Sequence, residues 1–159
     1  MLSQTSPLTL LDPEVTRRFG AHVADRVGPG DVLLLAGPIG AGKTHFARAL
    51  IQHRLAKVGL FEDVPSPTFT LVQTYQADCE IWHADLYRLT DPDELFELGL
   101  DGAFDTALCL IEWPDRLGSE TPENAALLQF QSSEDGLARQ LELSGNVKLA
   151  RRILEGWNG

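Results

Sequence analysis

Two runs in this chain are apolar at every position, and they set the expected architecture. Val32 to Ala36 reads Val-Leu-Leu-Leu-Ala, and Ala107 to Ile111 reads Ala-Leu-Cys-Leu-Ile. A strand that is apolar on both faces is typical of the centre of a parallel sheet, because helices cover both of its faces. The two runs therefore predict two central strands of such a sheet.

Apolar residues at helical spacing predict four helices around these strands. Two of the helices begin with Asp-Pro, at Asp12 and at Asp91, which places an N-cap residue before a proline at the first helical position. The helix expected from Lys43 to Val58 is apolar on more than one face, which indicates that it is well buried. The expected helices are Asp12 to Val27, Lys43 to Val58, Asp91 to Gly99, and a tail helix after Asn146 with Leu149, Ile153 and Trp157 on one face.

Further strands are expected on both sides of the centre. Asp135-Gly136 is a hairpin turn signal, so the two strands around it are expected to be antiparallel. The pattern as a whole predicts a P-loop NTPase-like α/β fold of three layers, with a mostly parallel central sheet and a C-terminal antiparallel hairpin. The expected strands are Leu8 to Leu11, Thr68 to Tyr75, Glu80 to Asp85, Ala125 to Gln131 and Leu137 to Leu143.

Composition and charge narrow the class of protein. The chain has 159 residues, 43% of them hydrophobic, which predicts one globular domain over residues 1–159. Its formal net charge of −10 argues against a protein that binds nucleic acid or an anionic membrane by itself. No apolar run approaches the roughly 18 residues that span a bilayer, and residues 1–11 lack a signal-peptide pattern. We therefore expect a cytoplasmic protein.

The two cysteines carry no metal-site signature. Cys79 and Cys109 lie 30 residues apart, without CxxC or Cys/His spacing. Both flank apolar runs, so we expect them to be small core residues.

Residues 37–44, Gly-Pro-Ile-Gly-Ala-Gly-Lys-Thr, match the phosphate-binding pattern GxxxxGK[ST] at every fixed position. The glycines let backbone N–H groups approach phosphate oxygens at the start of a helix, where the helix dipole favours negative charge. The lysine neutralises the outer phosphates, and the threonine hydroxyl can bind Mg²⁺. The expected nucleotide contacts are Gly37, Ile39, Gly40, Ala41, Gly42, Lys43 and Thr44.

Two acids at strand ends are candidates for the chemistry. Phosphoryl transfer needs a carboxylate that holds Mg²⁺ and a group that orients the attacking molecule. Glu112 and Asp85 each end an apolar strand, so they are the expected functional acids. Together with Thr44 they are the expected Mg²⁺ ligands. The alternative for each acid is a solvated charge at a strand end. His83 is interpreted as a structural hydrogen-bonding residue.

Other residues near these motifs allow two interpretations each. Trp113 either stacks on the nucleotide or packs against the protein. Residues 66–70, Ser-Pro-Thr-Phe-Thr, either form a switch-like loop that carries Thr68 toward the γ-phosphate or are only a proline-bounded loop. Arg88 and Arg116 either meet phosphate charge or form surface ion pairs, and we expect surface ion pairs.

The motifs GPIGAGKT, SPTFTLV, HADLYRL, DPDEL, LGL and IEWPD, in this order and spacing, closely resemble the TsaE (YjeE) family over residues 32–117. The resemblance implies a small P-loop ATPase that uses ATP and Mg²⁺. It is expected to work with the TsaD and TsaB proteins in making N6-threonylcarbamoyladenosine on tRNA, to meet tRNA only through that complex, and to have no membrane partner. The residues carried over are Lys43 and Thr44 for phosphate and Mg²⁺, Thr68 in the switch-like segment, Asp85 and Glu112 as functional acids, and Trp113 near the nucleotide.

Three positions depart from the family's usual residues. At the position of Pro38 the family commonly has an acidic or polar residue. At the position of His45 it commonly has threonine, and at the position of Ala84 a larger apolar residue. None of them removes an expected ligand, so they bear on the fine geometry of the loop.

Three other functions of a P-loop protein are considered: a small-molecule kinase, a GTPase, and a binding module that does not hydrolyse nucleotide. A small-molecule kinase would need an acceptor pocket and usually an arginine-bearing lid, and no arginine-rich insertion is present. A GTPase would carry an NKxD-type guanine motif, which Asn146-Val147-Lys148 does not supply. A nucleotide-gated binding module without hydrolysis stays open. The acidity fits a protein that docks on another protein and leaves most tRNA contact to its partners.

Overall fold

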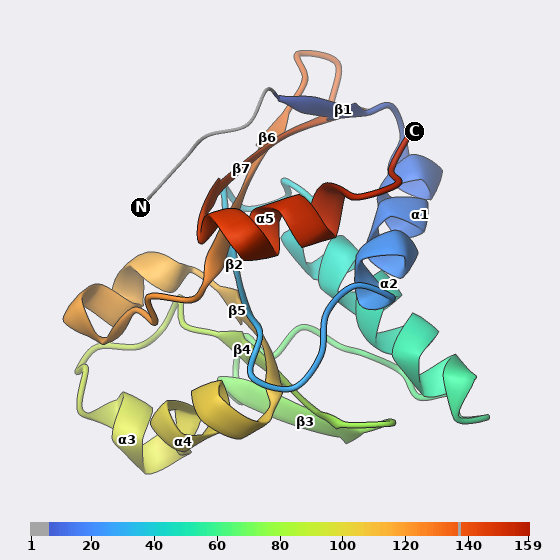
Figure 1. Cartoon of the computed structure of the whole chain (residues 1–159). Coiled ribbons are helices and arrows are strands. Elements are labelled where there is room, and N and C mark those ends of the chain that lie inside the picture. The colour runs from blue at the N-terminus through green and yellow to red at the C-terminus, as the bar shows by residue number, and fades with distance from the viewer. Residues whose placement is uncertain (1–6, 137) are drawn as a thin grey trace.

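The structure is a computed structural model that describes residues 7–136 and 138–159. Within these residues the chain forms one seven-stranded sheet with helices on both faces (Figure 1). The elements are β1 (Leu8–Leu10), α1 (Pro13–Ala24), β2 (Val32–Ala36), α2 (Lys43–Lys57), β3 (Val72–Gln76), β4 (Glu80–Asp85), α3 (Glu94–Leu98), α4 (Leu100–Thr106), β5 (Leu108–Glu112), the 3₁₀ helix η1 (Pro114–Glu120), β6 (Ala126–Ser132), β7 (Arg139–Gly145) and α5 (Val147–Leu154).

The sheet has a parallel centre and antiparallel edges. Its strand order is β1-β7-β6-β2-β5-β4-β3, and β6, β2, β5 and β4 run parallel to one another. β3 pairs antiparallel with β4 on one edge, and β7 and β1 add antiparallel strands on the other. This arrangement confirms the predicted parallel centre and the C-terminal hairpin, which is β6–β7.

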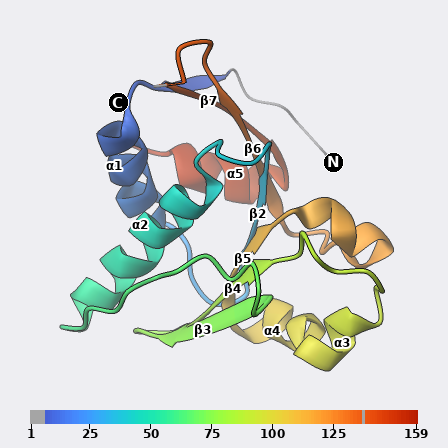
Figure 2. The same cartoon turned by 180° about the vertical axis from the view of Figure 1, so that it is seen from behind.

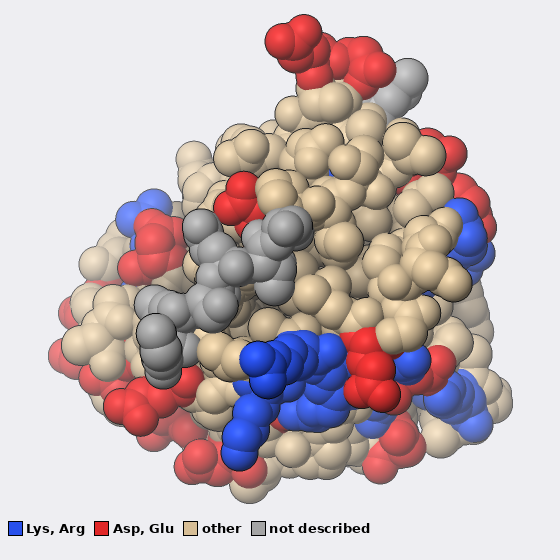
Figure 3. Space-filling model, turned by 45° about the horizontal axis from the view of Figure 1, so that its top comes forward, with Lys and Arg blue, Asp and Glu red and all other residues tan. Residues whose placement is uncertain are grey.

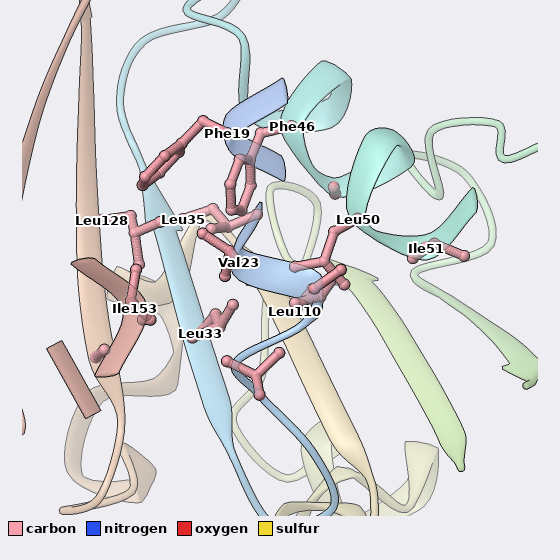
Figure 4. Packing of buried hydrophobic residues seen from close by; sticks show 14 of the residues in the cluster. Phe19, Val23, Leu33, Leu35, Phe46, Leu50, Ile51, Leu110, Leu128 and Ile153 are labelled. Carbon is pink, nitrogen blue, oxygen red and sulfur yellow. The ribbon is translucent and has the colours of Figure 1, made fainter. Parts of the chain in front are cut away.

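The apolar side chains of β2 explain why the sheet is covered on both faces. Leu33 and Leu35 belong to a core that they share with α1, α2 and α5 (Figure 4). Val32 and Leu34 belong to a second core, formed with α3, α4 and η1. Figures 1 and 2 show α1 and α2 on one side of the molecule and α3 and α4 on the other. The predicted three layers are confirmed.

The N-cap expected at Asp12 is present, the one expected at Asp91 is not, and Asn146 caps α5 without having been predicted to do so. Asp12 Oδ1 accepts a hydrogen bond from Val15 N at 2.9 Å, and Asn146 Oδ1 accepts one from Leu149 N at 3.0 Å. None of the helices described is long and apolar enough to cross a membrane. Of the two cysteines, Cys109 is fully buried and Cys79 packs, partly buried, against the first core. Cys109 is therefore the core residue expected, whereas Cys79 is only partly buried beside the core.

Three segments differ from the prediction. The expected strand from Thr68 begins only at Val72, because Leu71 has a left-handed φ of 68° and residues 68–70 form a turn. The third helix begins at Glu94 instead of Asp91, and a further helix, α4, follows after Gly99. The 3₁₀ helix η1 was not predicted. The expected start of the last strand, Leu137, lies outside the described residues, and β7 begins at Arg139.

A candidate nucleotide-binding cleft

A cleft of about 490 Å³ opens where the parallel strands β2, β4 and β5 end. Loops and strand ends at this edge of the sheet commonly form ligand sites, because their backbone is not used in strand pairing. Segments far apart in the sequence meet here. The lining residues are Ile39, Gly40, Gly42, Lys43, Thr44, His45, Ser66, Thr68, Asp85, Tyr87, Glu112, Trp113 and Arg139.

The glycine-rich loop lies between β2 and α2, as the motif predicts. Gly37 must be a glycine, because its φ is 141° and a Cβ there would lie 2.5 Å from the carbonyl oxygen of Phe130. Gly42 is the N-cap of α2, and no side chain caps this helix. The amides of the first turn of α2 are therefore available to an anionic ligand, at the positive end of a 15-residue helix.

Lys43 lies inside the cleft and is only 5% exposed. Its Nζ donates a hydrogen bond to Gly37 O at 2.5 Å and lies 3.7 Å from the centroid of the Trp113 ring. Burial lowers the pKa of Lys43, and the carboxylates of Glu112, Asp85 and Asp115 oppose that shift. The ammonium group is thus held by one carbonyl and a ring face, two partners that a phosphate oxygen can displace.

Glu112 is the centre of a buried hydrogen-bond chain. Its carboxylate accepts a bond from Thr44 Oγ1, at 2.9 and 3.0 Å from its two oxygens, and approaches His83 Nε2 at 2.6 Å. His83 is fully buried, and its Nδ1 has no hydrogen-bond partner. Because a carboxylate oxygen is an acceptor, His83 Nε2 carries a proton and donates this bond to Glu112. His83 therefore forms a buried hydrogen bond, as expected, and forms it with a candidate functional acid.

Asp85 stands beside Glu112, because the register of β4 and β5 pairs these two residues. Asp85 Oδ2 accepts a hydrogen bond from Thr68 Oγ1 at 3.1 Å, and Oδ1 accepts one from Tyr87 N at 3.0 Å. Ser66 Oγ lies 2.7 Å from Thr68 Oγ1 and extends this chain. The loop of residues 66–70 therefore brings the hydroxyls of Ser66 and Thr68 to the cleft, and its switch-like role stays a prediction.

Not every residue expected to contact the nucleotide reaches the cleft with its side chain. The methyl group of Ala41 is fully buried in the core, so only its backbone can face a ligand. Gly37 contributes the carbonyl that binds Lys43. Ile39 lines the cleft and is 76% exposed.

Trp113 has a left-handed backbone, with φ 57° and ψ 54°. This uncommon conformation for a bulky residue turns its ring toward Lys43 and Tyr87. The centroids of the Trp113 and Tyr87 rings lie 4.8 Å apart, at an interplanar angle of 54°. Trp113 therefore packs against the protein and also borders the cleft, and its stacking on a nucleotide stays a prediction.

Arg139 and Tyr87 line the cleft but were not expected there. Arg139 comes from the C-terminal hairpin, and its Nη2 donates to Gly40 O at 3.4 Å. No local pattern marks it, since it reaches the loop only through the pairing of β7 with β6. Tyr87 lies two residues after Asp85 and could have been inferred from that position.

The expectation of surface ion pairs for Arg88 and Arg116 was wrong. Within the described residues neither forms one. The Arg88 guanidinium lies over the exposed Phe69 ring, 5.1 Å from its centroid, and Arg116 Nη2 donates to Tyr87 O at 3.3 Å. An aromatic face and a backbone carbonyl each provide a partner that spacing along the chain does not reveal.

The donor set of the cleft suits a magnesium–phosphate ligand. Mg²⁺ prefers oxygen ligands, and the Thr44 hydroxyl and the Glu112 and Asp85 carboxylates line the cleft and supply them. The amides of the glycine-rich loop and the Lys43 ammonium supply positive charge in the same cleft.

Comparison with known proteins places this cleft in a family context. A family model described as "Threonylcarbamoyl adenosine biosynthesis protein TsaE" matches residues 10–141. A Rickettsia felis protein named tRNA threonylcarbamoyladenosine biosynthesis protein TsaE is 42% identical over 109 residues, which are 68% of this chain but only 62% of that protein. The protein of the same name from Haemophilus influenzae is 37% identical over 80% of this chain and 78% of its own length.

The solved structures include a close match to the fold. The crystal structure of YdiB from Bacillus subtilis aligns with a TM-score of 0.74 and 25% sequence identity. The alignment covers 96% of this chain and 95% of that one. The likeness therefore extends over the sheet, both helical layers and the cleft.

Proposed function

The chain belongs to the TsaE family of threonylcarbamoyladenosine biosynthesis proteins, and from this premise we propose that it binds and hydrolyses ATP in the cleft. We further propose that turnover supports N6-threonylcarbamoyladenosine formation on tRNA by acting on the TsaD–TsaB complex in the cytoplasm. The observation that carries the proposal is the convergence of Lys43, Thr44 and Glu112 at the end of a complete phosphate loop.

Each group has a defined part in this proposal. The loop amides and Lys43 bind the phosphate chain and offset its negative charge. Mg²⁺, when bound, neutralises charge on the outer phosphates, and Thr44 and Glu112 provide oxygen ligands for it. Asp85 would orient the attacking water, and its position at the end of the neighbouring strand, with Thr68 Oγ1 bonded to it, supports this role.

Slow turnover by the isolated protein is expected from the arginines. Arg139 lines the cleft, but its guanidinium bonds to the carbonyls of Gly136, Ala138 and Gly40. Arg139 would have to give up these three bonds to reach the γ-phosphate. A free arginine at the γ-phosphate contributes roughly 10³–10⁵ in rate where one is present. A partner protein that supplies such a charge would accelerate hydrolysis.

The test measures ATP binding and phosphate release by the purified protein, alone and with TsaD and TsaB. We expect Mg²⁺-dependent ATP binding, slow release alone and faster release with the partners. Lys43→Ala should abolish binding, whereas Lys148→Ala, an exposed lysine outside the cleft, should not. Binding by Lys43→Ala equal to the parent would refute the phosphate-loop assignment. Bound ATP with background release in both conditions would favour a nucleotide-gated binding module.

A further inference from the structure

A second groove, of about 510 Å³, lies on the other face of the sheet from α1 and α2. It runs between the helix pair α3–α4 and the segment that follows η1. Leu95, which is 2% exposed, forms its floor, and Phe104 and Pro122 are half-buried in its walls. The Phe96 side chain, 49% exposed, stands at its edge. The groove has the volume and apolar lining of a site for one or two large side chains.

Acidic side chains surround this apolar groove. Asp101, Asp105, Glu120 and Glu123 line it and are exposed, and none of them forms an ion pair within the described residues. No lysine or arginine is among its lining residues. No group of three or more His, Cys, Asp or Glu side chains in the described chain could hold a metal ion. The acids therefore form an open rim, separate from any cation cage.

The rim is part of a strong charge asymmetry in the chain. Residues 91–124 contain ten acidic residues and one basic residue, Arg116, whereas the chain as a whole has 23 acidic and 13 basic residues. The rest of the chain is thus nearly neutral, and almost the whole net charge of −10 lies in this segment. Figure 3 shows acidic side chains gathered at the lower left, the side on which α3 and α4 lie in Figure 1.

We propose that this groove docks a lysine- or arginine-rich segment of a partner protein that inserts one large apolar side chain. An apolar floor with a charged rim is the arrangement of a protein–protein contact, in which a buried anchor gives affinity and rim charges give specificity and association rate. The same acids repel the phosphate backbone of a nucleic acid and the headgroups of an anionic membrane. A basic protein segment satisfies both features of the groove.

The groove is connected to the nucleotide cleft through short stretches of chain. η1, next to one wall, begins directly after Glu112 and Trp113. The segment that leads to α3 begins at Leu86, directly after Asp85, and Arg116 of η1 donates to Tyr87 O in it at 3.3 Å. Both stretches thus lead from the groove to the Tyr87–Trp113 pair beside the cleft.

The experiment uses the full chain and a synthetic probe. The probe is a fluorescein-labelled helical peptide of about 14 residues with lysines on one face and leucines on the other, and its binding is followed by anisotropy. Two control peptides carry alanine in place of leucine, or glutamate in place of lysine. The groove variants are Phe96→Ser and the pair Asp101→Asn with Asp105→Asn. The matched controls are Phe61→Ser, at an exposed phenylalanine elsewhere, and Glu134→Gln, at an exposed acid on the β6–β7 hairpin.

We expect the parent chain to bind the probe. The dissociation constant of each groove variant should be at least about tenfold higher, because the variants remove an apolar contact of the buried side chain or the charges of the rim. The two control variants should bind as the parent does, and neither control peptide should bind with comparable affinity. Unchanged binding by the groove variants would overturn the proposal, and so would equal affinity for the alanine peptide, which would show diffuse charge attraction. Self-association of the parent that the groove variants abolish would assign the groove to a second copy of the chain and also overturn it. Because the assay contains no nucleotide, its outcome is independent of whether the chain hydrolyses ATP.

Discussion

The hydroxyl of Thr44 donates a hydrogen bond to the carboxylate of Glu112, although 68 positions separate the two residues in the sequence. Thr44 stands in the first turn of α2 and Glu112 at the end of β5. The bond exists because β5 lies beside β2, the strand that leads into the glycine-rich loop. The two groups proposed to hold Mg²⁺ thus satisfy one another, which lowers the cost of burying the carboxylate.

Removing the charge of Glu112 or Asp85 should slow ATP hydrolysis without preventing ATP binding. Glu112→Gln and Asp85→Asn keep the shape of the side chain but remove the oxygen charge that would hold Mg²⁺ and orient water. We expect ATP to bind still and phosphate release to fall by at least about 100-fold. The measurement is phosphate release per bound ATP with TsaD and TsaB present. The exposed acids Glu134 and Asp63 give matched controls, as Glu134→Gln and Asp63→Asn. Release at the parent rate in both cleft variants would show that these acids are not the functional ones.

Two glycine substitutions should have opposite effects on stability. Gly37→Ala places a methyl group 2.5 Å from Phe130 O at a φ of 141°, so the free energy of unfolding should fall by about 2 kcal/mol or more. At Gly102, in α4, a methyl group would meet only open space, so Gly102→Ala should raise the free energy of unfolding by about 0.5–1 kcal/mol. Urea unfolding measures both. Equal effects in the two variants would contradict the close contact between the loop and β6.

The buried thiol of Cys109 should make stability depend on pH in the alkaline range. Burial raises the pKa of Cys109 from 9.0 to about 12. The unfolded chain therefore releases the thiol proton at a lower pH than the folded chain does. The contribution of the protonated Cys109 thiol to the free energy of unfolding is fully present below pH 9. It is lost as the pH rises from 9 toward 12. The loss should reach about 1 kcal/mol near pH 10.

Comparing the parent with Cys109→Ala isolates this effect, since every other titrating group is present in both. The variant should be less stable at pH 7, because it leaves a small cavity in the core. The difference in unfolding free energy should then shrink as the pH rises above 9. A difference that stays constant from pH 7 to 10 would show that the thiol ionises equally in both states.

The sequence predicted the parts of the fold that depend on local pattern. The run Val32–Ala36 is apolar throughout because its side chains enter two cores, and that property is visible without coordinates. The glycine-rich loop follows from residue type, since Gly37 and Gly42 need conformations that other residues rarely adopt. The pairing of Asp85 with Glu112 follows once both acids are placed at the ends of parallel strands.

What could not be predicted depends on contacts between distant segments. Residues 68–75 alternate like a strand, yet Leu71 turns the chain and its carbonyl accepts a bond from Asp85 N at 2.8 Å. That bond and the bond from Thr68 Oγ1 to Asp85 fix the loop, and neither has a local signature. Arg139 enters the cleft through strand pairing alone. The helix end at Gly99, where φ is 84°, was predicted, but the further helix α4 that follows it was not.

The contact between Lys43 and Trp113 should report nucleotide binding through fluorescence. Lys43 Nζ lies 3.7 Å from the Trp113 ring centroid, and the same ammonium group bonds to Gly37 O. A phosphate chain offers charged oxygens, which bind an ammonium group more strongly than a neutral carbonyl does. We therefore expect Mg²⁺–ATP to draw Lys43 away from the indole and to change the Trp113 emission in a saturable way. Trp113→Phe should lose most of the change. Trp157→Phe removes an indole that packs on Phe19, with ring centroids 5.0 Å apart, and should retain the change. An undiminished change in Trp113→Phe would place the ligand away from this ring.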